Sequence, residues 1–451
     1  MTDTSRPAWK LSSLLPWPAR HPMAPGDVMR GLSGALLLAT PAVWAAWLGL
    51  ATYAPWGAAA GLGIAFGAAA VVVMAEALIL AARPRLLEPL FGGLDRMYRA
   101  HKWLGIAALV LMILHNSAEP EFEHAVRETA AGELAEGAGE LAFNALLAMI
   151  ALSLLRRLPF LPFETPYHWW RLAHRFMGVL FGLVLFHQFL VDLPAGISPT
   201  LAWLLNGFGA AGLAAWVHTE LLAPLLRRRT YSVRSIERQG TTVSLVLAPE
   251  GRPMRWQPGQ FAFVRSPAAG LAEPHPFTIA SAPAPDGTLR LAVRTLGDWT
   301  RRLPGALQPG AQVLLEGPYG RFDFRKGGAR QVWLAGGIGI TPFLAWAESL
   351  KADDPRDIHL VVSVHDPEDL IGLPVLQAAA ARNPRFGFTV VASGQTGRLT
   401  AARLVGLVPF AIAGADLWFC GPDRLRESIV QGLNALGQAP GRVRFEAFDF
   451  A

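Results

Sequence analysis

Cysteine is almost absent from this sequence of 451 residues, in which Cys420 is the only one. A single cysteine excludes an internal disulfide, cysteine ligation of an iron–sulfur cluster and a cysteine-based metal cluster. Charged residues are also scarce, at 16% of the chain, whereas hydrophobic residues make up 52%. Such an average over a chain of this length indicates two parts that face different solvents, one of them lipid.

Long hydrophobic runs occur only before about residue 222, and the remainder mixes strands, turns and charges as a soluble protein does. A helix needs about 20 apolar residues to cross roughly 30 Å of hydrocarbon. We therefore predict a six-helix all-α transmembrane bundle over residues 31–222, after a cytoplasmic N-terminal segment, 1–30, without a cleavable signal peptide. The predicted spans are 31–53, 58–81, 101–118, 139–157, 169–192 and 199–221.

Lysine and arginine cluster before the first span, between the second and third, between the fourth and fifth, and after the sixth. The positive-inside rule places these segments and both termini in the cytoplasm, with the acidic segment between the third and fourth spans outside. We expect an integral protein of a bacterial inner membrane. The same clusters account for much of the net charge of +6, and because no nucleic-acid motif is present we expect no nucleic-acid partner.

Histidines mark both ends of the third span, His101 and His115, and both ends of the fifth, His174 and His187. The two spans run in the same direction, so His101 faces His174 (the inner pair) and His115 faces His187 (the outer pair). Ionisable groups at membrane depth are costly and tend to serve a function. Two imidazoles from facing helices can ligate one haem iron, so the pairs predict two b-type haems roughly 20 Å apart.

The spacing within the fifth span poses a geometric problem. At about 100° per residue, the 14-residue step of the third span returns to within about 40° of the same helix face, whereas the 13-residue step of the fifth misses by about 140°. Either the fifth helix is irregular or its haems approach from different sides. Gly178 and Gly182 permit both.

Two further domains follow the membrane part. Residues 229–327 contain short strands at "TYSVRSIERQG", "TVSLVLAP", "FAFVRS", "LRLAVRTL" and "QVLLEGPYG", which predict a small antiparallel β-barrel. Residues 328–451 begin with a strand, a glycine turn and a helix in "RQVWLAGGIGITPFLAWAESL", and further strands alternate with helices. That alternation is typical of a parallel α/β nucleotide-binding domain.

The glycine turn of the last domain suits a phosphate. Gly336, Gly337 and Gly339 let the backbone approach a pyrophosphate at a helix N-terminus, where free amides favour anions. Pro342 stands where the G-x-G-x-x-G fingerprint has its last glycine, so the turn alone is weak evidence.

Taken together, the motifs resemble flavin reductases of the ferredoxin–NADP reductase type fused to the membrane domain of the NADPH oxidase and ferric reductase family. The resemblance covers nearly the whole chain from about residue 31. The motifs appear in this order: "DRMYRAHKWLG", the two histidine pairs, "PGQF", "HPFTIAS", "LGDWT", "GPYG", "GGIGITP", "CGP" and "FEAFDF". The resemblance implies a transmembrane bundle followed by an FAD-binding β-barrel and an NAD(P)-binding α/β domain.

The resemblance also implies an FAD site. Thr278 would lie near the reactive flavin nitrogen and His275 near the pyrophosphate, and Phe450 would cover the flavin ring, with Phe448 as the other candidate. The flavin-binding strand would comprise His275, Pro276, Phe277 and Thr278, and the flavin phosphates would be supported by Arg294, Gly297, Trp299 and Thr300.

For the nicotinamide nucleotide, the resemblance implies the segments around the glycine turn and the cysteine. The dinucleotide would be held by Gly336, Gly337, Gly339, Thr341 and Pro342, and the nicotinamide would be bordered by Cys420, Gly421 and Pro422. Thr278, Cys420 and Phe450 would then be the catalytic residues, although a small buried strand cysteine explains Cys420 equally well. His365 and Asp366 follow the strand "LVVSV" where the family often has an arginine, so NADH and NADPH both remain candidates.

The implied activity is transfer of electrons from cytoplasmic NAD(P)H through FAD and two b-type haems to an outer acceptor, either oxygen or a ferric chelate. Glu119 lies one turn beyond His115, and no arginine lies at the outer ends of the first two spans, which weakens the assignment to superoxide formation. The alternatives are a haem subunit that delivers electrons to a periplasmic partner protein, and a non-enzymatic haem sensor. A sensor would not need the flavin-binding sequence.

Overall fold

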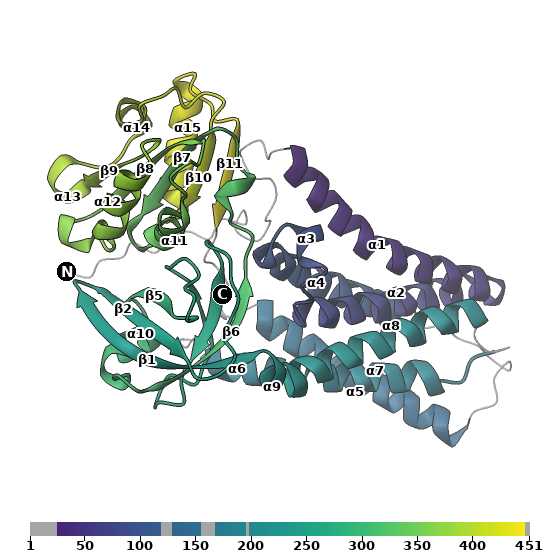
Figure 1. The fold of residues 1–451 in the computed structure, drawn as a ribbon. Coiled ribbons are helices and arrows are strands. Elements are labelled where there is room, and N and C mark those ends of the chain that lie inside the picture. Colours follow the sequence, from purple (N-terminus) through teal and green to yellow (C-terminus); the bar gives the residue numbers. More distant parts are fainter. Residues whose placement is uncertain (1–24, 119–128, 155–166, 195–197, 447–451) are drawn as a thin grey trace, which may run out of the picture.

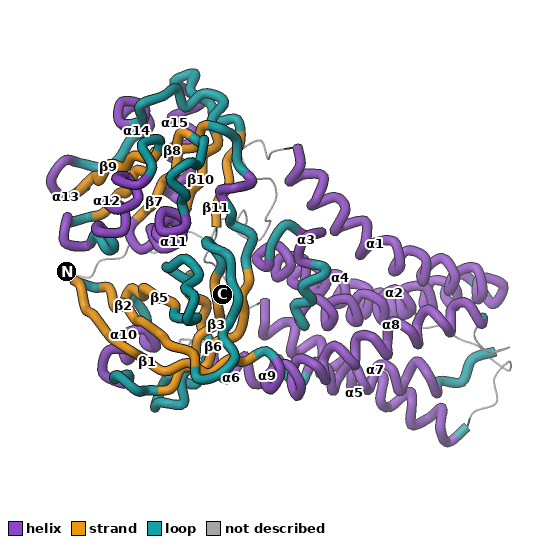
Figure 2. The backbone as a smooth tube through the Cα atoms, viewed as in Figure 1, coloured by secondary structure: helices purple, strands orange, loops and turns teal. Residues whose placement is uncertain are grey.

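The computed structural model describes residues 25–118, 129–154, 167–194 and 198–446. Figure 1 shows a bundle of long helices at one side, with a β-barrel at its end and an α/β domain beside the barrel. Figure 2 separates the parts by secondary structure, since the bundle is helical and the strands lie in the other two. This arrangement confirms the predicted fold class.

Six helical segments in the described residues are long and apolar enough to cross a membrane, as predicted. They are Ser33–Trp56, Ala58–Ala81, Arg96–Ala118, Ala130–Ser153, Trp169–Leu190 and Pro199–Leu222. The second has the largest buried share, 61%, and its alanines and glycines allow neighbouring helices to approach closely. A Cβ added at Gly49 would lie 3.1 Å from the Cα of Ala65, and one at Gly212 would lie 2.8 Å from the Cα of Ala75.

The bundle contains long helices and several short helical elements. The long helices are α1 (Pro25–Tyr53), α2 (Ala58–Ala81), α4 (Leu94–Ala118), α5 (Ala130–Leu154) and α8 (Pro199–Val217). The short elements are η2 (Ala54–Trp56), α3 (Glu88–Phe91), the π-helical turn η3 (His218–Leu222) and α9 (Ala223–Leu226). Helix α5 begins nine residues before the predicted boundary at 139. There Thr129 accepts a hydrogen bond from the Gly132 amide at 3.0 Å, and the alanines and glutamates favour helix despite the glycines among them.

The fifth span is broken into α6 (Tyr167–His174) and α7 (Met177–Leu190). Between them the chain makes a tight turn, in which the Phe176 amide donates to the carbonyl of Ala173 at 3.0 Å. The helix is therefore irregular directly after His174, which is the first of the two alternatives that the histidine spacing left open.

The β-barrel is antiparallel, with strand order β4-β3-β6-β1-β2-β5. Its strands are β1 (Arg228–Gln239), β2 (Thr242–Pro249), β3 (Phe261–Arg265), β4 (His275–Thr278), β5 (Leu289–Arg294) and β6 (Gln312–Tyr319). A bridge between Ile279 and Leu291 connects the two edges, and helix α10 (Asp298–Ala306) follows β5. Alternating residues such as Val243, Leu245 and Leu247 fill the interior, as period-two patterning requires.

The last domain has a parallel sheet of order β11-β10-β7-β8-β9. Its strands are β7 (Arg330–Gly336), β8 (Asp357–Val364), β9 (Phe386–Ala392), β10 (Asp416–Cys420) and β11 (Arg442–Glu446). The helical elements are η5 (Gly337–Ile340), α11 (Thr341–Ser349), η6 (Pro367–Asp369), α12 (Leu373–Arg382), α13 (Ser393–Thr396), α14 (Ala401–Leu407) and α15 (Asp423–Ala435). The chain leaves β7 in one direction and returns to β10 on its other side, so the carboxyl ends of β7 and β10 form the topological switch point where such sheets bind ligands.

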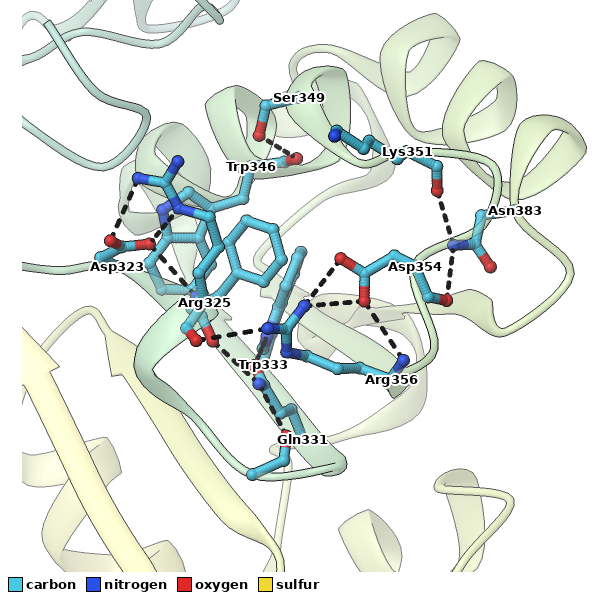
Figure 3. Close-up of polar contacts among 12 residues, drawn as sticks. Asp323, Arg325, Gln331, Trp333, Trp346, Ser349, Lys351, Asp354, Arg356 and Asn383 are labelled. Atoms are coloured by element: carbon cyan, nitrogen blue, oxygen red, sulfur yellow. Dashed lines mark hydrogen bonds and ion pairs between the residues drawn. The ribbon is translucent and has the colours of Figure 1, made fainter.

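A polar network joins the barrel to the α/β domain near the short turn η4 (Phe324–Lys326) (Figure 3). Arg325 binds Asp323 at 2.8 Å and reaches the side-chain oxygen of Gln257 in the barrel at 3.3 Å. Arg356 donates to the Arg325 carbonyl at 3.2 Å while it pairs with Asp354. The bond from Arg356 to the Arg325 carbonyl thus links the loop before β8 to the segment that follows the barrel.

Candidate functional site

The structure brings the inner pair of histidines together from α4 and α6. The ring centroids of His101 and His174 lie 6.0 Å apart, with the planes at 77°. His101 Nδ1 donates to the Ala77 carbonyl at 2.9 Å. His174 Nδ1 lies 3.5 Å from the Ser153 hydroxyl, and the Trp170 ring stacks on His174 at 5.0 Å.

The outer pair has the same arrangement between α4 and α7. His115 and His187 have ring centroids 6.3 Å apart, with the planes at 69°. Nδ1 of His115 donates to the Gly63 carbonyl at 2.8 Å, and Nδ1 of His187 donates to the Ala135 carbonyl at 2.9 Å. A glycine faces each ring: a Cβ at Gly67 would lie 2.9 Å from His115 Nδ1, and one at Gly139 would lie 2.6 Å from His187 Nδ1.

Both pairs pass a geometric test for axial ligation of a haem iron. A carbonyl only accepts, so the imidazoles bonded through Nδ1 carry their proton there and have Nε2 available as a ligand, the usual second-shell pattern of metal-binding histidines. Two metal–nitrogen bonds of about 2 Å, plus roughly 1 Å from each nitrogen to its ring centre, give a centroid separation of about 6 Å. The observed 6.0 and 6.3 Å match that value.

The predicted flavin strand, β4, carries buried polar atoms that have no hydrogen-bond partner among the described residues. These atoms are Thr278 Oγ1 and His275 Nε2, together with Nε1 of Trp299 at the start of α10. The rings of His275 and Trp299 lie 4.8 Å apart, and those of Phe277 and Trp299 lie 5.4 Å apart. Unpaired buried donors in a native protein call for an explanation, and a bound polar cofactor such as FAD provides one.

The surroundings of His275 connect the flavin strand to the membrane bundle. His275 Nε2 lies 3.6 Å from Glu273, and the other oxygen of Glu273 lies 3.7 Å from Arg171 on α6. Burial lowers the pKa of His275, and the nearby Glu273 carboxylate only partly opposes this. His275 is therefore neutral near pH 7.

A helix begins where phosphate support was predicted. Gly297 is the N-cap of α10, and the Thr300 hydroxyl accepts from the Gly297 amide at 2.9 Å. Arg294 ends β5, and a Cβ added at Gly337 would lie 4.0 Å from its guanidinium nitrogen. The arginine predicted for FAD thus lies beside the glycine turn predicted for the nicotinamide nucleotide.

The structure also brings the glycine turn and the "CGP" segment together at the switch point. A Cβ at Gly339 would overlap the carbonyl of Cys420, and one at Gly336 would lie 2.8 Å from Pro422. Gly421 has a φ of +155° and approaches Gly336 just as closely. Glycine is therefore required on both sides for the two segments to meet.

Cys420 is fully buried at the end of β10. Burial, supplemented by the charge of Glu446, raises the pKa of its thiol well above the ordinary value, so the thiol is protonated at neutral pH. The remaining predicted residues of the turn, Thr341 and Pro342, open α11 and are also buried. Phe448 and Phe450 lie outside the described residues, as does Glu119 in the predicted outer segment.

Arg83 joins the barrel to the bundle and was not anticipated. Its φ is +52°, its guanidinium lies 4.3 Å from the Phe263 ring centroid, and it pairs with Glu316 at 3.3 Å. Tyr319 donates to the same carboxylate at 2.8 Å, and burial together with the charge of Glu316 raises the pKa of Tyr319 to about 12. Positive φ in a residue other than glycine depends on tertiary contacts, so local sequence gives no signal for it.

Comparison with known proteins agrees with this geometry. The family description "Ferric reductase like transmembrane component" matches residues 66–185, "FAD-binding domain" matches 226–323 and "Oxidoreductase NAD-binding domain" matches 333–431. The chain thus contains a transmembrane domain like that of ferric reductases, followed by an FAD-binding domain and an oxidoreductase NAD-binding domain. The resemblance inferred from the motifs is confirmed.

Individual relatives are similar over part of their length. A superoxide-generating NADPH oxidase heavy chain of Dictyostelium discoideum is 28% identical over 43% of this chain and 40% of its own. The Arabidopsis thaliana ferric reduction oxidase 8 is 29% identical over 42% of this chain and 27% of its own. The toluate 1,2-dioxygenase electron transfer component of Pseudomonas putida is 29% identical over 42% and 58% respectively. The chain thus spans less than two thirds of each of these relatives.

Proposed function

We propose that this protein oxidises NAD(P)H at the cytoplasmic face and passes the electrons through FAD and two b-type haems to an acceptor on the outer face. The acceptor is either oxygen, which gives superoxide, or ferric iron. The observation that carries the proposal is the pair of bis-histidine arrangements at two levels of one bundle, with ring separations of 6.0 and 6.3 Å. The Arg171–Glu273 contact supports it, because it links the helix that carries His174 to the segment directly before the predicted flavin strand.

Each cofactor supplies chemistry that side chains lack. Bound FAD mediates between a donor that releases two electrons together and one-electron carriers, and bound haem iron carries single electrons. The two cofactors therefore account for the presence of a flavin domain and a histidine-bearing bundle in one chain.

The residues of the chain bind and orient these groups. The Thr278 hydroxyl would donate to the reactive flavin nitrogen, and His275 and Trp299 would supply further hydrogen bonds to FAD from their unpaired nitrogens. The amides that begin α10 and α11 bind the phosphates of FAD and of the nicotinamide nucleotide. By the same resemblance, Cys420, as a protonated thiol, would border the nicotinamide, and Phe450 or Phe448 would cover the flavin ring.

The direct test is anaerobic optical spectroscopy of the detergent-purified protein, with NADH or NADPH added before an acceptor. We expect reduced b-type haem bands, which decay on adding air if oxygen is the acceptor and on adding a ferric chelate if iron is. The absence of haem bands would refute the proposal and leave a membrane-anchored flavin reductase.

A His115→Ala variant tests the outer step separately. It removes one ligand of the outer pair, so we expect haem content to fall to about half and transfer to the outside to stop, while NAD(P)H still reduces the flavin. His218→Ala, a histidine of the same domain outside both pairs, is the control and should retain both haems. Normal reduction of an outside acceptor by the His115 variant would contradict the proposed path.

The alternative is a subunit that hands electrons to a periplasmic partner protein. The absence, in sequence, of an arginine at the outer ends of the first two spans weakens superoxide formation, which leaves ferric iron or such a partner as the acceptor. Haem bands that persist after both air and ferric chelate, together with an outer protein that copurifies and discharges them, would establish this alternative.

A further inference from the structure

The break in the fifth span leaves the Arg175 carbonyl without its helical donor. In a continuous helix the Val179 amide would donate to the Arg175 carbonyl, but here it donates to the carbonyl of Phe176 at 2.9 Å. Trp216, near the end of α8, donates its indole N–H to the Arg175 carbonyl at 2.9 Å. A side chain from the next span thus replaces the missing helical hydrogen bond.

Two more contacts converge on the same place. The Arg175 guanidinium pairs with Glu220 at 2.5 Å, and Glu220 follows Trp216 by four residues, so the two project from one face of α8 and its π-helical turn. Gly178 makes room, because a Cβ there would overlap the Trp216 indole. We refer to Arg175, Gly178, Trp216 and Glu220 as the break clamp.

We propose that the break clamp positions His174 opposite His101 and thereby determines the geometry of the inner haem site; this inference rests on the proposed function. The 13-residue step between the histidines of the fifth span turns a straight helix to a face about 140° away, and an irregularity between the two histidines changes that relation. The break follows His174 directly, at the end of the eight described residues of α6. His187 lies beyond the break on α7 and is held separately by the Ala135 carbonyl.

The test compares clamp variants with matched controls on the same helices. Trp216→Phe removes the indole N–H donor and keeps an aromatic ring. Gly178→Ala places a methyl group where it would overlap the Trp216 indole. The controls are Trp203→Phe, at an indole of α8 that is 81% exposed, and Gly182→Ala, where a Cβ would meet nothing within 4 Å. Haem per chain and the low-temperature spectrum of each haem are measured, with FAD content and elution from size exclusion as checks on folding.

Two backgrounds identify the affected haem. In a His115→Ala background, which retains only the inner site, both clamp variants should lower haem retention by roughly tenfold, the usual effect of removing a second-shell partner. In a His101→Ala background, which retains only the outer site, they should leave the haem content and spectrum unchanged. Equal effects in both backgrounds, or no effect in either, would overturn the proposal.

The clamp predicts one rescue. If Gly178→Ala prevents folding, the double variant Gly178→Ala/Trp216→Ala removes the overlap and should behave like Trp216→Ala alone. A double variant as defective as Gly178→Ala would show that Gly178 acts elsewhere and would contradict the clamp. Wild-type protein that binds no haem would instead refute the proposed function, so the two failures are distinguishable.

Discussion

At the scale of single residues, the buried polar atoms around β4 distinguish the flavin region from the rest of the barrel. Thr278 is only 4% exposed, and its hydroxyl has no partner in the described part of the chain. A buried hydroxyl that makes no hydrogen bond lowers the free energy of unfolding by roughly 1–3 kcal/mol. The protein therefore retains this group at the expense of its own stability, as expected where a ligand supplies the missing bond.

Replacement of Thr278 by valine should separate stability from binding. We expect the flavin-free protein to be unchanged or more stable, because the unpaired hydroxyl is gone, and FAD affinity to fall by roughly 10- to 100-fold, because one hydrogen bond is lost. Thermal unfolding and FAD titration measure the two effects. Thr242→Val, at another buried threonine of the barrel, should leave FAD affinity as it is, and an equal loss there would contradict the assignment.

His359 predicts an acid sensitivity that is independent of the cofactors. Burial lowers the pKa of this β8 side chain from its ordinary 6.5, while Nε2 lies 2.9 Å from the Thr389 hydroxyl. The unfolded chain then binds the proton more readily than the folded one, so the free energy of unfolding falls as the pH drops below about 6.5. His359→Gln should flatten the change in Tm between about pH 8 and pH 5.5, whereas the exposed His365→Gln should not. A wild-type Tm that is constant over this range would refute the prediction.

At the scale of helices and strands, hydrophobic period and length predicted the six spans, and the histidine positions predicted which helices face each other. The start of α5, strand β11 and the location of the break were not predictable. Each depends on a partner distant in sequence. At the start of α5, Thr129 accepts from the Gly132 amide and is itself held by Asp192. Strand β11 forms by pairing with β10, and Trp216 supports the break in the fifth span. The glycines that face the outer histidines carry no local signal either, because their spacing to those histidines is set by helix packing.

Gly139 on α5 offers a test at this scale. A methyl group there would lie 2.6 Å from His187 Nδ1, so Gly139→Ala should push the imidazole out of line and remove the outer haem, leaving roughly half of the haem content. Gly137→Ala changes the same helix where a Cβ meets nothing within 4 Å, and should have no such effect. Haem content per chain and the optical spectrum of the reduced protein test this prediction. A Gly139→Ala variant that keeps both haems would contradict the assignment of His187 as a haem ligand.

At the scale of the whole molecule, the barrel contacts the bundle through strand β6 and the loop before α4. Besides the Arg83–Glu316 pair, Arg85 donates to the Gly317 carbonyl at 2.9 Å and the Gly320 amide donates to Glu88 at 3.3 Å. Phe261 and Phe263 extend the hydrophobic core of the bundle into the barrel. These contacts dock strands β3 and β6 on the bundle, and β3 pairs in turn with the predicted flavin strand β4.

Arg83→Ala should therefore affect the transfer between domains. Loss of the cation–π contact and the ion pair weakens docking by about 1–2 kcal/mol, so flavin-to-haem transfer should slow by up to roughly tenfold while reduction of the flavin keeps its rate. Stopped-flow spectroscopy separates the two steps. Arg330→Ala, at an exposed arginine that begins β7, is the control, and slowed flavin reduction in the Arg83 variant would show a wider structural defect.

Only Arg227 separates the end of α9 from the beginning of β1, and its guanidinium donates to the Ala82 carbonyl at 2.9 Å. The connection between membrane helix and flavin barrel is thus a stiff joint, without a flexible linker that would let the barrel search for its docking position. In kinetic terms the two partners have a fixed effective concentration, so electron delivery to the bundle is a first-order event. Its rate should be insensitive to dilution of the protein in lipid, and a free copy of the barrel should compete poorly with the attached one.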